Sequence, residues 1–241
     1  MAKSMELLYN GALELGLTLD DNKLSKFETY YEALRTWNQQ INLTAITEYS
    51  SVEIKHFLDS LTCFPLVNDK LPQKPMLIDI GAGAGFPLLP LKLALPEINV
   101  TLVDSVGKKT KFIQHIVDLL EIPDVTIITD RAEKLGHDPL HREMFDLVLV
   151  RGVAKFPTLL EYALPLCRLG GEVIAWKHGG IEQELARGAQ ALKTLGGAIP
   201  RIELITLPDL KDNRILVSVE KIFHTPKLYP RQPGTPSKNP L

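Results

Sequence analysis

Three glycines that alternate with alanines form the most chemically informative stretch of the sequence. Gly81, Gly83 and Gly85 directly follow an apolar run at residues 76–80 that has the length and branching of a buried strand. A glycine lacks a Cβ, so the backbone can turn sharply there and approach a ligand closely. Pro87 then suits the first turn of a helix. Strand, glycine turn and helix predict the ligand-binding start of a doubly wound α/β domain; the alternative is a tight turn without a ligand.

An acidic residue ends the next predicted strand, at residues 99–104. Asp104 follows Gly85 at about the separation expected for a carboxylate that binds a ribose. Such a carboxylate can accept hydrogen bonds from both ribose hydroxyls, each worth about 1.5–3 kcal/mol. The same side chain could instead cap the helix that begins near residue 107. The sequence therefore predicts a nucleotide-like ligand and leaves both roles of Asp104 open.

Basic residues gather where the predicted strands end. Lys108 and Lys109 lie in the first turn of a helix predicted over residues 107–121, where cations oppose the helix dipole. Arg151 and Lys177 lie at the ends of the fourth and fifth predicted strands. Ligands of such sheets bind at the carboxyl ends of the strands. The pattern favours a partner that carries phosphates, and the alternative is an ordinary solvated charged face.

The elements that must position these residues begin with helices over residues 4–66 and a linker at 68–75. Five strands then alternate with helices, the last after a turn at Gly170-Gly171, at residues 76–80, 99–104, 125–129, 145–150 and 172–177. Two further strands, at 201–207 and 214–222, are joined by a short loop around Asp209 to Asn213 and must be antiparallel. We therefore predict an α/β fold with a Rossmann-like seven-stranded sheet, mostly parallel with a terminal antiparallel hairpin. This ending is typical of class I S-adenosylmethionine (SAM) methyltransferases and argues against a nicotinamide oxidoreductase.

Three regions of different composition suggest the domain organisation. We expect an N-terminal helical extension over residues 1–70, a methyltransferase domain over 71–223, and a basic proline-rich tail over 224–241. The tail has five prolines and no acidic residue. Such a segment is expected to be mobile by itself. It is either a free chain end or an arm that binds phosphates.

Composition excludes several classes of protein. Net charge is −2, so any nucleic-acid footprint must be local, and no apolar run reaches the length of a membrane span. No hydrophobic signal region follows the first residues, and Cys63 and Cys167 are isolated, which suits a reducing cytoplasm. His137 and His141 are separated by Pro139, which spoils a helical metal pair. We expect a cytoplasmic, monomeric protein that uses no metal.

Several motifs together resemble the ribosomal RNA small subunit methyltransferase G family, also called glucose-inhibited division protein B. The resemblance covers nearly the whole chain and rests on Trp37-Asn38, Asn42-Leu43-Thr44, His56 with Asp59-Ser60, the run from Asp79 to Pro87, Leu102 to Ser105 with Lys108 and Phe112, Arg131-Ala132-Glu133, Arg151, and Tyr229-Pro230-Arg231 with Pro233 to Pro236. It implies transfer of the SAM methyl group to N7 of one guanine in 16S ribosomal RNA, with the small ribosomal subunit as partner.

The resemblance also implies which residues form the site. The expected cofactor-binding residues are Asp79, Gly81, Gly83, Gly85, Phe86, Asp104, Ser105, Val106, Ala132, Glu133 and Arg151. Arg151 is also a candidate for positioning the reactants, facing either the cofactor carboxylate or the RNA. The candidates for RNA contact are Lys108, Lys109, Lys177 and Arg231.

The expected reaction fits the residues that the chain lacks. Guanine N7 carries a free lone pair and no proton, so the reaction needs positioning rather than a general base. The sequence has no Asn/Asp-Pro-Pro-aromatic motif for exocyclic amines, and neither cysteine has a Pro-Cys context for attack on cytosine. A small-molecule SAM methyltransferase and a SAM-binding protein without turnover are the alternatives.

Overall fold

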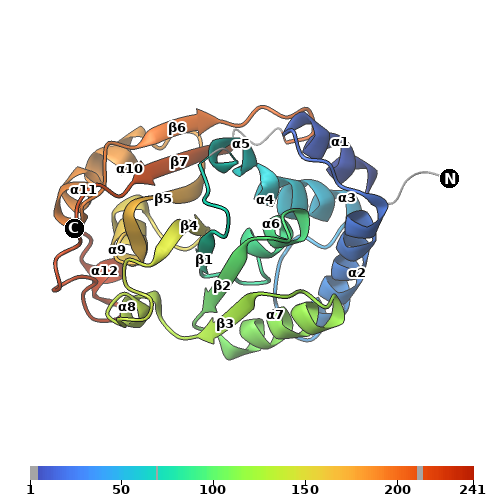
Figure 1. Cartoon of the computed structure of the whole chain (residues 1–241), viewed down its shortest axis with the longest axis horizontal. Helices are drawn as coiled ribbons and strands as arrows, with labels where there is room; N and C mark the ends of the chain where they lie inside the picture. The colour runs from blue at the N-terminus through green and yellow to red at the C-terminus, as the bar shows by residue number, and fades with distance from the viewer. Residues whose placement is uncertain (1–4, 69, 211–213) are drawn as a thin grey trace.

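The computed structural model describes residues 5–68, 70–210 and 214–241. Seven strands form one sheet in the order β3-β2-β1-β4-β5-β7-β6 (Figure 1). The strands are β1 (Met76–Ile80), β2 (Asn99–Asp104), β3 (Val125–Thr129), β4 (Phe145–Arg151), β5 (Cys167–His178), β6 (Arg201–Leu204) and β7 (Arg214–Glu220). The five strands β3, β2, β1, β4 and β5 are parallel, and β7 pairs antiparallel with both β5 and β6. The predicted fold class is confirmed. The predicted hairpin loop extends over residues 211–213, which lie outside the described residues.

The fifth strand is longer than the sequence predicted. The turn expected at Gly170-Gly171 is wrong, because β5 continues through both glycines from Cys167. The pairing of β4 with β5 shifts register between Phe145 and Leu147, opposite this stretch. A Cβ on Gly171 would lie 2.9 Å from the Asp146 carbonyl oxygen, so only glycine lets the strand pass this irregularity unstrained.

Helices cover both faces of the sheet (Figure 1). Their bounds are α1 (Glu6–Glu14), α2 (Asp21–Asn38), α3 (Tyr49–Val52), the π-helix η1 (Glu53–Leu58), α4 (Asp59–Leu61), α5 (Phe64–Val67), α6 (Leu88–Ala94), α7 (Gly107–Leu119), α8 (Ala132–Leu135), α9 (Phe156–Ala163), α10 (Glu182–Arg187), α11 (Ala189–Leu195) and α12 (Thr235–Lys238). Successive side chains of a strand point to opposite faces. Accordingly Leu147 and Leu149 join one buried core, whereas Val148 and Val150 join the other.

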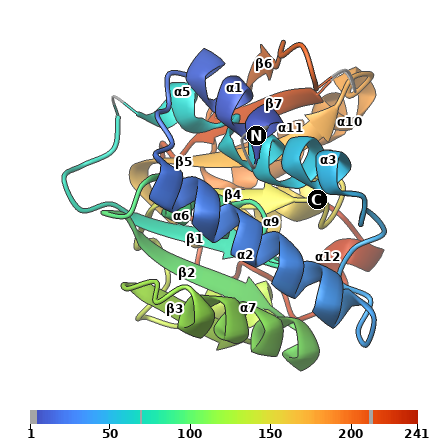
Figure 2. The ribbon, with the colours of Figure 1, turned by 90° about the vertical axis from the view of Figure 1, so that its right-hand side faces the viewer.

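The N-terminal helices pack on the face that α6 and α7 also cover. Figure 2 shows α2 in front of α6 and alongside α7. The Asp20 carboxylate begins α2 by accepting the Lys23 N–H at 2.8 Å. Phe27 and Tyr30 of α2 are fully buried in the same core as Leu77 of β1. The predicted boundary of the N-terminal helical extension at residue 70 stays a prediction. One core joins these helices to the sheet.

The C-terminal tail is folded onto the protein, so the expectation that it is mobile is wrong. Pro230 and Pro236 are buried, and Arg231 forms an ion pair with Glu161 of α9. The tail itself contains no acidic residue that could pair with Arg231, and Glu161 of α9 is that partner. Within the described residues, no helix is both long and apolar enough to cross a membrane.

Candidate active site

The glycine turn lies at the carboxyl end of β1, in the middle of the sheet. The N–H of Gly81 and the N–H of Ala82 both donate to the carbonyl oxygen of Val103, at 2.8 and 2.9 Å. Gly81 has φ +72°, and a Cβ on it would lie 2.5 Å from Cγ2 of Val153. Any other residue at this position would be strained, because its backbone disfavours a positive φ and its side chain would collide with Val153.

Asp104 joins the glycine turn to the end of β2. Its Oδ2 accepts the Gly83 N–H at 3.0 Å, and its Oδ1 accepts the Val106 N–H at 2.8 Å. Val106 is the N-cap residue of α7 and makes no side-chain cap, and Asp104 accepts the N–H of Val106 instead of an N–H of the first helical turn, so the capping role predicted for Asp104 is wrong. The side chain is buried at the wall of a cavity, and each carboxylate oxygen keeps acceptor capacity for a ligand.

A cavity of about 240 Å³ lies against this turn, and we call it the glycine-turn cavity. The predicted cofactor residues that line it are Gly81, Asp104, Ser105, Val106, Ala132 and Glu133. The sequence did not predict seven further lining residues, Ile80, Val103, Asp130, Arg131, Gly152, Val153 and Tyr162. Lys109, predicted for RNA contact, also lines it, with its Nζ 3.9 Å from Asp104 Oδ2.

Two predicted cofactor residues, Gly85 and Asp79, do not line the glycine-turn cavity but lie next to the turn. A Cβ on Gly85 would lie 2.5 Å from the hydroxyl of Tyr30, whose O–H donates to the Ala84 carbonyl oxygen. Asp79 is fully buried, and burial raises the pKa of its carboxyl well above the ordinary value. Its Oδ2 accepts the Leu88 N–H at 3.3 Å, whereas Oδ1 has no hydrogen-bond partner among the described residues.

Phe86 and Arg151 do not line the glycine-turn cavity. Phe86 is buried between the rings of Tyr30 and His56, with centroids 5.6 and 4.6 Å away. The guanidinium carbon of Arg151 lies 5.3 Å from the centroid of the Phe86 ring. Phe86 is therefore a platform that supports His56 and Arg151, and it connects the glycine turn to a second cavity.

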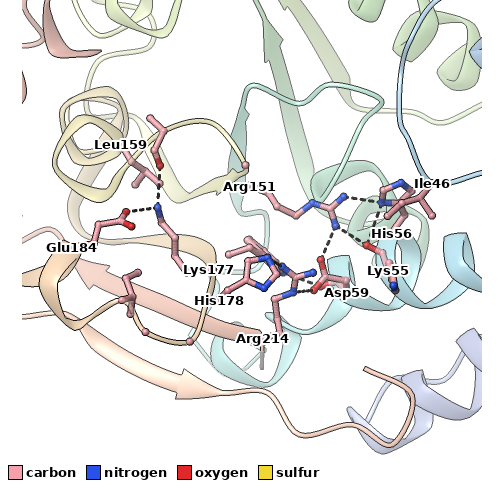
Figure 3. A pocket seen from close by; sticks show the side chains of 16 residues that line it. Ile46, Lys55, His56, Asp59, Arg151, Leu159, Lys177, His178, Glu184 and Arg214 are labelled. Carbon is pink, nitrogen blue, oxygen red and sulfur yellow. Dashed lines mark hydrogen bonds and ion pairs between the residues drawn. The ribbon is translucent and has the colours of Figure 1, made fainter. Parts of the chain in front are cut away.

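The second cavity is larger, about 650 Å³, and we call it the arginine cavity (Figure 3). Its wall combines the N-terminal helices with the ends of β4, β5 and β7, which contribute Lys55, His56, Asp59, Arg151, Trp176, Lys177, His178 and Arg214. Gly152 lines both cavities. The two cavities therefore adjoin where β4 ends.

Two arginines share one buried carboxylate in this wall. Asp59 Oδ2 lies 2.8 Å from Nη1 of Arg151, and Oδ1 lies 2.8 Å from Nε of Arg214 (Figure 3). Burial raises the pKa of Asp59 and lowers the pKa of Arg151, and the attraction between the charges opposes both shifts. The arrangement fixes two cationic guanidinium groups at the cavity. No sequence motif pointed to Arg214. Asp59 belongs to the family motif that also contains His56, but the sequence assigned it no role.

His56 holds the other side of the Arg151 guanidinium. Its Nδ1 lies 3.2 Å from Arg151 Nη2, and its Nε2 lies 2.7 Å from the Thr44 hydroxyl oxygen. Burial, and then the charge of Arg151, lower the pKa of His56 from 6.5 to about 3. Nδ1 also lies 3.2 Å from the Lys55 carbonyl oxygen, so Nδ1 faces both a donor and an acceptor and its role depends on the tautomer. His56 lies in the π-helix η1, a rare geometry that is frequent at functional sites.

The predicted RNA-contact residues have different surroundings. Lys108 and Lys109 border a hollow of about 230 Å³ beside residues 40–43. The Nζ of Lys177 lies 2.6 Å from Glu184 Oε1 and donates to the Ala154 carbonyl oxygen at 3.0 Å, so its charge is already paired. Arg231 is paired with Glu161 of α9. No group of three or more potential metal ligands occurs among the described residues.

Comparison with known proteins identifies close relatives. The family model described as rRNA small subunit methyltransferase G matches residues 23–207. A protein named ribosomal RNA small subunit methyltransferase G from Roseiflexus castenholzii is 47% identical over 98% of this chain and 100% of its own length. A protein of the same name from Leuconostoc citreum is 42% identical over 99% of each chain.

Solved structures of methyltransferases share the fold at low sequence identity. One chain in the complex between the Haloferax volcanii Trm112 methyltransferase activator and a methyltransferase superimposes with a TM-score of 0.53 at 13% identity. The match covers 79% of this chain and 98% of that chain. This likeness supports the class I methyltransferase fold and says nothing about substrate.

Proposed function

Because the chain belongs to the rRNA small subunit methyltransferase G family, we propose that it transfers the methyl group of SAM to N7 of one guanine in 16S ribosomal RNA of the small subunit. The structural observation that carries this proposal is the pair of cavities that adjoin at Gly152. A cofactor in one cavity and a base in the other would meet at the carboxyl edge of the sheet, where ligands of this architecture bind.

The residues of the glycine-turn cavity fit SAM. Asp104 presents free acceptor capacity for the two ribose hydroxyls, and Gly81 allows close backbone approach. The unpartnered Oδ1 of Asp79 behind the turn suits a cationic amino group, reached directly or through water. Ala132 and Glu133 would border the adenine. When bound, SAM supplies an activated methyl group on a sulfonium.

The arginine cavity fits a guanine that has left its stack. Arg151 uses N–H groups on Asp59, His56 and the Lys55 carbonyl oxygen, which leaves others for a ligand. Guanidinium donors suit the O6 atom of guanine. N7 must stay free to attack the methyl group, and its lone pair needs no base. The protein's contribution is thus to hold N7 in line with the methyl group and to exclude water.

The hollow beside α7 suits the RNA backbone. Lys108 is exposed there and Lys109 is half-buried, next to the polar side chains of Gln40 and Asn42. Cations in this position attract phosphates, and their contribution weakens as salt rises. We also propose that the protein acts as a monomer, and the ribosomal substrate implies a cytoplasmic location.

Nucleoside mass mapping tests the reaction. The protein and SAM are incubated with 30S subunits or 16S RNA from cells that lack this gene. We expect one new 7-methylguanosine, and no product when the modified guanosine is replaced by 7-deazaguanosine. Calorimetry in parallel should show binding of SAM and not of NAD. An unaltered RNA map together with SAM binding would indicate a small-molecule substrate, and binding of NAD alone would refute the methyltransferase assignment.

A further inference from the structure

The C-terminal residues 229–238, which we call the tail segment, lie against α8 and α9. Figure 1 shows this part of the chain, with α12, beside both helices. Helix α8 carries Glu133, and Tyr162 lies in α9; both side chains line the glycine-turn cavity. The tail segment therefore packs behind one wall of that cavity.

On α8, the tail segment contacts both ends of the helix. The Gly234 N–H donates to Glu133 Oε1 at 3.1 Å. At the other end, the His137 side chain donates from Nε2 to the Pro230 carbonyl oxygen at 2.5 Å. Gly136 permits this approach, because a Cβ there would lie 2.7 Å from the Pro230 ring. The orientation of Glu133 thus depends on where the tail segment lies.

On α9, the tail segment is held by a buried charge. Glu161 is fully buried, and both of its carboxylate oxygens accept from Arg231, at 2.9 Å from Nε and 2.6 Å from Nη2. The Thr158 hydroxyl donates to the Pro236 carbonyl oxygen at 2.9 Å. The Ser237 hydroxyl donates to the Gly234 carbonyl oxygen at 3.0 Å, and Tyr162 directly follows Glu161 in α9. A bidentate pair of this kind fixes geometry as well as contributing energy.

We propose that the tail segment positions Glu133 and Tyr162 in the wall of the cofactor site and thereby sets the affinity of the enzyme for SAM. This inference rests on the proposed function, which places the adenosine part of the cofactor in the glycine-turn cavity. Arg231 is then a positioning residue that acts through Glu161, and it does not contact RNA. The tail segment completes the cofactor site rather than extending the RNA site.

Linkage makes the proposal testable in the unaltered protein. If the packed tail segment raises cofactor affinity, the cofactor must stabilise the packed tail segment by the same factor. Hydrogen exchange is measured with and without saturating S-adenosylhomocysteine, a non-reacting product. We expect amides of residues 229–238 to exchange about fivefold or more slowly with the ligand, the lower range of coupling between sites. Unchanged exchange in this segment would overturn the proposal.

A charge-matched pair of variants separates this role from RNA binding. Arg231→Gln and Lys227→Gln each remove one cation from the tail, and Lys227 is exposed. We expect Arg231→Gln to raise the Kd for S-adenosylhomocysteine and the KM for SAM about fivefold or more. The kcat at saturating SAM and the KM for RNA should stay unchanged, and Lys227→Gln should leave the Kd for S-adenosylhomocysteine unchanged.

The outcomes distinguish failure of this proposal from failure of the proposed function. Equal losses of RNA affinity in both variants, with cofactor affinity intact, would instead identify a phosphate-binding arm and overturn the positioning role. If Arg231→Gln does not fold, the exchange experiment on the unaltered protein still decides. If the unaltered protein binds neither SAM nor S-adenosylhomocysteine, the proposed function itself fails.

Discussion

Replacing His56 with glutamine should make the protein's stability less sensitive to acid. The imidazole is 7% exposed and stacks on Phe86, and Arg151 Nη2 lies 3.2 Å from its Nδ1. Burial is the largest cause, and repulsion from Arg151 the next, of a pKa lowered from 6.5 to about 3. Below pH 6.5 His56 therefore binds a proton in the unfolded chain but stays neutral in the folded protein.

The direction and size of the effect follow from this difference. The folded-state pKa is the lower one, so stability is full above about pH 6.5 and is lost as pH falls from there toward 3. A pH of 5 lies roughly 1.5 units below the pKa of His56 in the unfolded chain, and each unit corresponds to about 1.36 kcal/mol. His56 should therefore cost about 2 kcal/mol of unfolding free energy between pH 7 and pH 5.

Urea unfolding followed by tryptophan fluorescence measures this quantity. The free energy of unfolding is determined at pH 7 and pH 5, for the unaltered protein and for His56→Gln. The fall between the two pH values should be about 2 kcal/mol smaller in the variant. His115→Gln, at a half-buried histidine outside both cavities, controls for deletion of an imidazole. An equal fall in the unaltered protein and in His56→Gln would refute a neutral, buried His56.

Two further predictions concern the glycine-turn cavity, and SAM titration by calorimetry checks both. Asp104→Asn should weaken SAM binding at least about fivefold, because the amide turns a donor toward a backbone N–H and an unpaired buried donor costs about 1–3 kcal/mol. Gly81→Ala should abolish measurable binding, because its Cβ would lie 2.5 Å from Val153; Gly16→Ala, with a similar positive φ and open space around it, should bind normally. Unchanged SAM affinity in either cavity variant would remove that residue from the cofactor site.

The strands were predictable from the sequence because each is a short apolar run next to a turn residue. β1, β2 and β3 begin and end where predicted. β4 ends one residue later than predicted, and β6 and β7 end three and two residues earlier. The largest difference, at β5, has a tertiary cause: Gly171 fits against the Asp146 carbonyl oxygen of the neighbouring strand, and a pattern within one strand cannot show this. Glycine there marks a close approach instead of a turn.

The site was predictable only where its residues follow strand ends in order. Gly81 and Asp104 were found this way, since consecutive parallel strands bring their carboxyl ends together. Arg214 was missed because it lies in an antiparallel strand at the far end of the chain and reaches the site only by pairing with Asp59. The packing of the tail was also not predicted, because the acid that stabilises it, Glu161, lies on α9 and not in the tail.

The buried arrangement of Arg151, Asp59 and Arg214 is better explained by substrate than by stability. Exchanging a buried ion pair for well-packed apolar side chains is often neutral or stabilising by about 1–4 kcal/mol, so folding alone gives no reason for three charges here. The carboxylate balances one arginine and leaves a net positive wall, while neutral His56 adds no charge. Such a wall presents fixed N–H donors at the edge of the site where the guanine must meet the methyl group. Orientation of the base, as proposed above, would therefore account for this charge in the interior.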